Sequence, residues 1–251
     1  MDGGEFRPPP SANVAFHDVL ARAVDFSDGE YLCFSGRSSR FEGCKFDRIR
    51  VENGPLGLYP RSLFRDCSFR DAEFRIGASP HLARFERCSF DGATIQEWFT
   101  HCAEFVDCSF AGARIIGSRF FGTPIECYGW LEFRRRKRNE FAGNDFSEAE
   151  LIDTTFSAGI DLDAQRLPTG PGYLRINDAQ QRIAEARTRI ASWDGEAKRR
   201  GTTLLNALER ESRDLSQPDL FIRKDTYEMA PELAEKLWKL LATPPGDQIG
   251  G

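Results

Sequence analysis

The sequence contains few of the features that usually mark a membrane segment or a secreted protein. No stretch of about 18 apolar residues, the length that a membrane-crossing helix needs, occurs anywhere. The first residues, MDGGEFRPPP, have no apolar run after a basic region, so no signal peptide is indicated. We therefore expect a cytoplasmic protein without a membrane span.

Motifs of catalysis and metal binding are also missing. The 3 His residues, His17, His81 and His101, stand far apart, and there is no H-E-x-x-H, C-x-x-C, G-x-S-x-G or phosphate-loop pattern. The 7 Cys residues are odd in number and lack zinc-ligand spacing, so we expect reduced thiols rather than a disulfide framework. The sequence therefore predicts a protein that is not an enzyme and that has no cofactor or metal.

The charge of the chain does not identify a partner. Its 34 Lys and Arg and 39 Asp and Glu give a formal net charge of -5, which provides no general attraction to nucleic acid or to anionic membranes. The strongest local cluster is basic, at residues 134–138, and could contact an acidic protein, nucleic acid or lipid headgroups.

Phenylalanine is used far more than the other aromatic residues, and it recurs with a period of five. The chain has 21 Phe but only 5 Tyr and 4 Trp. A small residue lies two positions before nearly every bulky one, which neither a helix nor a flat strand explains. A square coil does explain it, because each pentapeptide then forms one side, with about 20 residues per turn. The aligned segments are FEGCKFDRIRV from 41, FRDCSFRDAEF from 64, FERCSFDGATI from 85, FVDCSFAGARI from 105 and FAGNDFSEAEL from 141.

The repeated Cys-Ser-Phe motifs at 67–69, 88–90 and 108–110 resemble the pentapeptide-repeat family, and the resemblance covers roughly residues 39–160. It implies a mainly β fold, a right-handed quadrilateral β-helix of about five to six coils. Members of that family include proteins that protect DNA gyrase from quinolones or peptide toxins, with a column that resembles a DNA duplex in width and negative charge.

The pattern also predicts which side chains fill the column. The cysteines would lie about 4.8 Å apart, the strand spacing, which is too far for disulfides, so we interpret them as small buried hydrophobes. The expected inward ladder consists of Phe46, Phe69, Phe90, Phe110 and Phe146 with Cys44, Cys67, Cys88 and Cys108.

The rest of the chain divides around this column. We expect a flexible tail at 1–13, an N-terminal cap and degenerate first coil at 14–40, the β-helix at 41–160, and an α-helical region at 173–243 after the linker LPTGPG. Apolar spacing predicts helices over about 177–193, 202–214 and 230–242. These helices could cap the column or form a homodimer, because the step Ile176, Ile183, Ile190 permits a coiled-coil seam.

Insertions in the repeat all fall at one position of the coil, after the third pentapeptide and before the next coil. They occupy 52–61, 76–82 and 123–138. Loops on a rigid scaffold often bind partners, although these loops could simply be padding. The candidate binding residues on this flank are Tyr59, His81, Trp98, Phe99, Tyr128, Trp130, Arg134, Arg135, Arg136, Lys137 and Arg138.

Two functional hypotheses follow. The first is a protein-binding scaffold that uses the insertion-bearing flank and the helical end. The alternative, which the family resemblance implies, is a DNA-mimicking, gyrase-protecting protein. Residues 1–160 contain 24 acidic and 20 basic residues, so the column carries only about -4, whereas a DNA mimic needs an acidic stripe.

Overall fold

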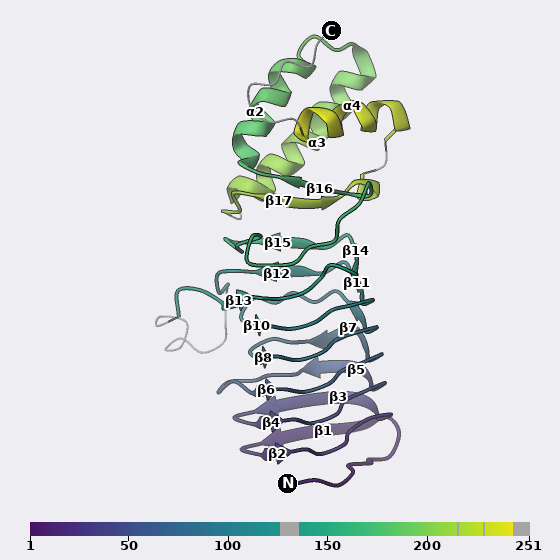
Figure 1. The fold of residues 1–251 in the computed structure, drawn as a ribbon, viewed down its shortest axis with the longest axis vertical. Coiled ribbons are helices and arrows are strands. Elements are labelled where there is room, and N and C mark those ends of the chain that lie inside the picture. Colours follow the sequence, from purple (N-terminus) through teal and green to yellow (C-terminus); the bar gives the residue numbers. More distant parts are fainter. Residues whose placement is uncertain (126–135, 215, 228, 243–251) are drawn as a thin grey trace. The chain divides into compact units, whose positions relative to one another are not determined.

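The computed structural model in Figure 1 describes residues 1–125, 136–214, 216–227 and 229–242. The chain forms two compact units. The solenoid unit contains Met1–Thr154 and Ile160–Pro168, and the helical unit contains Thr155–Gly159 and the residues from Thr169 onward.

The solenoid unit is built from two parallel sheets whose strands alternate along the chain. Each strand pairs with its counterpart one coil later, so that Phe41 is opposite Phe64 and Phe64 is opposite Phe85. The predicted parallel β-solenoid is therefore confirmed, and Figure 1 shows its strands stacked rung upon rung. The seven-stranded sheet contains β1 (Ala12–His17), β3 (Glu30–Arg37), β5 (Arg50–Pro55), β7 (Glu73–Ser79), β9 (Thr94–Gln96), β11 (Arg114–Ile116) and β14 (Glu150–Ile152). The six-stranded sheet contains β2 (Leu20–Arg22), β4 (Arg40–Glu42), β6 (Leu63–Arg65), β8 (Arg84–Glu86), β10 (Glu104–Val106) and β13 (Phe141–Ala142), and β12 (Arg119–Phe121) follows β11.

The coil turns its corners at residues in the left-handed backbone region. These residues lie two positions after an inward bulky side chain, as at Gly43 (φ 60°), Gly92 (φ 70°) and Asp66 (φ 53°). Glycine adopts this conformation without a Cβ penalty, and Asp tolerates it better than most residues. The backbone geometry of the corner therefore favours Gly or Asp at this position of the pentapeptide.

Stacked phenylalanines fill the column. The rings of Phe26, Phe46, Phe69, Phe90, Phe110 and Phe146 stack in sequence, with centroid distances of 4.6, 4.8, 4.9, 5.0 and 4.4 Å. Cys44, Cys67, Cys88 and Cys108 are buried free thiols, and burial raises the pKa of Cys88. These thiols therefore act as small core side chains.

The N-terminal residues belong to the column, so the prediction of a flexible tail at 1–13 is wrong. The amide of Gly3 donates to the Arg22 carbonyl and that of Phe6 to the Asp25 carbonyl, each at 2.8 Å. The Phe6 ring lies 5.4 Å from that of Phe26. Phe6 precedes Phe26 by one full coil, and this spacing is the signal that could have placed it.

The helical unit contains the three predicted helices. They are α2 (Ala179–Ile190), α3 (Gly195–Asp214) and α4 (Pro231–Ala242). The unit also contains β15 (Thr155–Ser157), the 3-10 helix η1 (Lys224–Thr226) and an antiparallel pair that we did not predict, β16 (Tyr173–Ile176) with β17 (Leu220–Arg223). No helix among the described residues is long and apolar enough to cross a membrane.

The apolar faces of these helices pack on one another. Ile176, Ile183 and Ile190 are buried in a core with leucines of α3 and α4, so the expected coiled-coil seam is occupied within the chain. The second helix begins at Gly195 rather than at 202, and it continues through Gly201. A Cβ at Gly201 would lie 3.4 Å from Ile190, an ordinary van der Waals distance, so the packing of the helices does not require glycine here.

Candidate functional site

The insertions stack along one side of the solenoid unit. Residues 56–62, 80–83 and 97–103, together with the described residues 117–125 and 136–140, lie between a strand of the seven-stranded sheet and the next strand of the six-stranded sheet. We call these segments the insertion flank. Backbone bonds join them from coil to coil, for example from the Leu82 amide to the Gly57 carbonyl at 3.0 Å and from the Thr100 amide to the Arg119 carbonyl at 3.0 Å.

Two of the predicted binding residues are structural. Trp98 is 0% exposed, with its ring 4.9 Å from that of Phe74, so its prediction as a contact residue is wrong. Trp98 occupies a position that a small residue occupies in the other coils, and the buried Thr100 occupies a position where the other coils have a bulky residue. The large indole therefore compensates for the small volume of Thr100. His81 is half-buried, its Nδ1 lies 3.2 Å from the Gly57 carbonyl, and burial lowers its pKa.

Exposed aromatic side chains do occur on the insertion flank. In the described part of the chain, Tyr59 and Phe99 are the aromatic residues among the exposed large hydrophobics, at 44% and 45% exposure. The Phe99 ring lies 6.2 Å from the exposed His101, which lies 4.9 Å from the buried Phe121. A surface aromatic cluster, Phe99 with His101, thus rests on the core.

The basic run beside this cluster is not uniform. Tyr128, Trp130, Arg134 and Arg135 lie outside the described residues. Arg136 is turned inward, because its Nη2 donates to the Cys102 carbonyl at 2.5 Å and to Asn139 Oδ1 at 2.9 Å. Lys137 and Arg138 are exposed. The run therefore supplies one structural cation, contrary to its prediction as a contact residue, and two cations that a partner can reach.

Asn139 fixes the end of the longest insertion. Its Nδ2 donates to the Phe121 carbonyl at 2.7 Å and to the His101 carbonyl at 3.1 Å. At the start of the insertion, the amide of Ile125 donates to the same His101 carbonyl at 3.2 Å.

Cys102 is disulfide-bonded, which corrects the expectation that every cysteine is a reduced thiol.

The buried carboxylate of Glu104 lies at the centre of a cluster of arginine side chains on the solenoid. Its side chain is 5% exposed and forms ion pairs with Arg61, with Arg84 at 2.8 Å and with Arg136 at 3.2 Å. Burial alone would raise the pKa of Glu104, but the hydrogen bond from Arg84 and the charges of Arg61 and Arg136 lower it. The carboxylate of Glu104 is thus charged near neutral pH and joins arginines of different coils.

Arg84 extends this cluster across the six-stranded sheet. It donates to Glu86 at 2.5 Å and to the more exposed Glu140 at 2.6 Å, and Arg65 donates to Glu86 at 2.7 Å. Sequence reasoning did not single out Glu104, Arg84 or Asn139. The signal in the sequence was an acidic residue, Glu104, at the position that Arg40, Leu63 and Arg84 occupy in the preceding coils.

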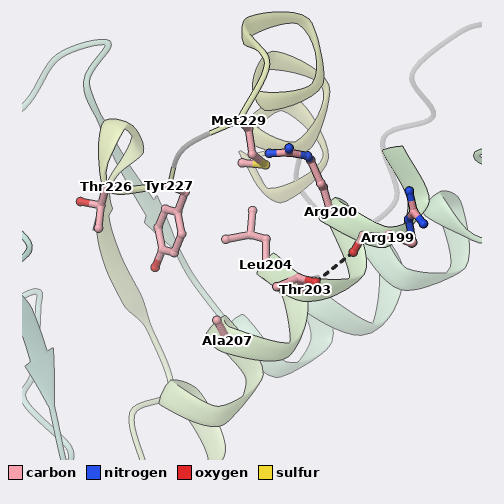
Figure 2. A pocket seen from close by; sticks show the side chains of 8 residues that line it. All are labelled: Arg199, Arg200, Thr203, Leu204, Ala207, Thr226, Tyr227 and Met229. Carbon is pink, nitrogen blue, oxygen red and sulfur yellow. Dashed lines mark hydrogen bonds between the residues drawn. The ribbon is translucent and has the colours of Figure 1, made fainter. Parts of the chain in front are cut away.

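The helical unit contains a cavity of about 440 Å³. Figure 2 shows Leu204 of α3 between Tyr227 on one side and Met229 and Arg200 on the other. Arg200 pairs with Glu196 at 2.8 Å, and Thr203 donates to the Arg199 carbonyl at 3.1 Å. None of the predicted site residues lines this cavity. Within the described residues, no cluster of His, Cys, Asp and Glu could hold a metal ion.

No protein-family model and no curated protein matches the chain. Similar solved structures include three of QnrB1, a plasmid-mediated fluoroquinolone resistance protein. One trypsin-treated variant has a TM-score of 0.31 and 17% identity, and the match covers 66% of this chain and 76% of that one. A second has a TM-score of 0.29 and 14% identity, covering 62% and 78%. The full-length protein has a TM-score of 0.26 and 13% identity, covering 66% and 91%. At these scores the likeness carries no argument about function, and the repeat architecture rests on the coils themselves.

Proposed function

We propose that this pentapeptide-repeat solenoid is a non-enzymatic scaffold that binds another protein through its insertion flank. The observation that supports this is the exposed Phe99–His101 cluster beside the exposed cations Lys137 and Arg138. Aromatic and Arg side chains dominate the binding energy of protein interfaces. Presenting them on a rigid column reduces the ordering cost of association.

The chemistry of the flank favours binding over catalysis. Its buried carboxylate, Glu104, is surrounded by three guanidinium groups, so it is neither a nucleophile nor a general acid near neutral pH. Asn139 and Arg136 bond backbone carbonyls of the preceding coil. These groups hold the surface in place, and the contact itself is assigned to the exposed side chains.

The double variant Phe99→Ala/Arg138→Glu tests the scaffold proposal. The tagged full-length protein and the variant are used to capture partners from an extract of the native host, and each captured protein is then titrated. We expect the variant to bind at least about 30-fold more weakly, because interface anchors contribute about 2 kcal/mol or more each.

A matched control changes an exposed apolar side chain and an exposed arginine elsewhere in the chain. Leu32→Ala/Arg210→Glu removes one exposed apolar side chain from β3 and reverses one exposed cation on α3. We expect this control to keep the partner. Equal capture by both double variants would remove the insertion flank as the contact.

The alternative, a gyrase-directed DNA mimic, requires a continuous acidic surface. Several outward acids of the column are paired with arginines one coil away. Arg48 bonds both oxygens of Asp28 at 2.7 and 2.9 Å, and Arg87 bonds both oxygens of Asp66 at the same distances. Such alternation along the corners neutralises the field that would imitate a duplex.

We therefore expect the purified protein neither to inhibit gyrase supercoiling nor to protect gyrase from a quinolone. The assay measures supercoiled plasmid over a protein titration, with and without the drug. Inhibition or protection at stoichiometric protein would identify gyrase as the partner and replace the expectation of a different one.

A further inference from the structure

Arg182 of α2 is a buried cation, and two of its three side-chain nitrogens have no hydrogen-bond partner. The residue is 8% exposed, and its Nε and Nη1 atoms are buried without a hydrogen-bond partner. The neighbouring Arg187 on the same helix is, in contrast, bonded to Asn206 at 2.7 Å and to Glu209 at 2.6 Å.

A second buried polar group without a partner lies on α3. Ser212 is 1% exposed, and its hydroxyl oxygen is buried without a hydrogen bond. Buried polar groups in folded proteins are nearly always hydrogen-bonded, so each exception calls for a ligand, an ion or a water. Arg182 and Ser212 both belong to the helical unit.

The packing of α2 against α3 brings these two residues to the same level. The helices run antiparallel: Arg187 bonds Asn206 and Glu209, and at the other end the Ala179 amide donates to the Pro218 carbonyl at 2.8 Å. Ser212 lies between Glu209 and Pro218, as Arg182 lies between Arg187 and Ala179. The register therefore places Arg182 and Ser212 at the same level along the two packed helices.

From this arrangement we propose that Arg182 and Ser212 bind a compact oxyanion, the shared chemistry of a carboxylate, a sulfate or a phosphate. Arg182 supplies the positive charge and two N–H donors, and Ser212 supplies one O–H donor. Charge-assisted hydrogen bonds of this kind are the strong ones, and an anion would offset the cost of burying the unpaired guanidinium. The site is separate from the insertion flank.

Thermal unfolding of the full chain tests the proposal. The midpoint is measured with sodium phosphate, sulfate or acetate, up to about 10 mM, against sodium chloride at equal ionic strength. At roughly tenfold excess over Kd, we expect the fitting anion to raise the midpoint by about 3–6 °C. A response to phosphate or sulfate assigns a tetrahedral anion, and a response to acetate assigns a carboxylate.

Three variants separate the site from general salt effects. Arg182→Met should abolish the anion response and, in chloride, raise the midpoint, because it removes an unpaired buried charge. Ser212→Ala should fold normally and reduce the response. Arg189→Met, at an exposed position on the same helix, should respond like the wild type.

Two results would overturn the oxyanion site. One is an equal anion response in all four proteins, which reports exclusion of salt from the surface rather than binding. The other is a wild-type midpoint that no anion changes, which would mean that water satisfies Arg182 and Ser212.

Discussion

Replacing Glu104 with glutamine is expected to lower the free energy of unfolding by about 3–5 kcal/mol, the cost of breaking a buried ion pair from one side. The substitution keeps the shape of the side chain but leaves Arg61, Arg84 and Arg136 around a neutral, 5%-exposed group. Urea denaturation measures the effect, because urea, unlike guanidinium, does not screen the charges.

Glu140→Gln provides the matched control. Glu140 pairs with the same Arg84 at 2.6 Å, but its side chain is 55% exposed, so its loss should cost less than about 1 kcal/mol. If the two variants lost equal stability, burial would not be what makes Glu104 important.

Low pH should remove the contribution of the Glu104 carboxylate to the free energy of unfolding. The folded-state pKa of Glu104 is held below its ordinary value of 4.5, so its stabilising effect is fully present above that value. It is then lost as the pH falls through the lower folded-state pKa. We expect the gap in unfolding free energy between the wild type and Glu104→Gln to be constant near neutrality and to narrow below about pH 4. A gap that widened in acid would contradict the assigned direction.

The column was predictable because its rule is local. An inward Phe sits in nearly the same surroundings in each coil, so a spacing of about 20 residues is enough to pair Phe41 with Phe64 and Phe64 with Phe85. The surplus residues between them are absorbed on the insertion flank and leave the stacking unchanged. The same rule reaches back to Phe6, which we had assigned to a tail.

The insertion flank was only partly predictable because its contacts have no period. Its position follows from counting residues, and the exposure of Phe99 agrees with that count. The burial of Trp98 depends on a volume exchange with Thr100 within one coil. The inward turn of Arg136 depends on a carboxylate more than thirty residues earlier, Glu104, and no local pattern links the two.

The stacked core gives the second large expected effect. Phe90→Ala should lower the free energy of unfolding by about 3–5 kcal/mol, the usual cost of removing a buried Phe ring. Phe90 is fully buried, and its ring is stacked 4.9 Å from Phe69 and 5.0 Å from Phe110. A ring removed here also leaves a gap between neighbouring coils, which the rigid column can close only in part.

The same substitution at the exposed Phe99 is the control, because it removes an identical ring that is not packed in the core. Phe99 is 45% exposed, so Phe99→Ala should change the free energy of unfolding by no more than about 0.5 kcal/mol.

Because each coil of a solenoid contacts mainly its neighbours, Phe90→Ala should also allow the coils on either side of Phe90 to unfold independently of each other. Hydrogen exchange would detect this as lower protection in β7, β9 and β11 than in β1 and β3. Uniform loss of protection along the column would instead show that the stack is cooperative over its whole length.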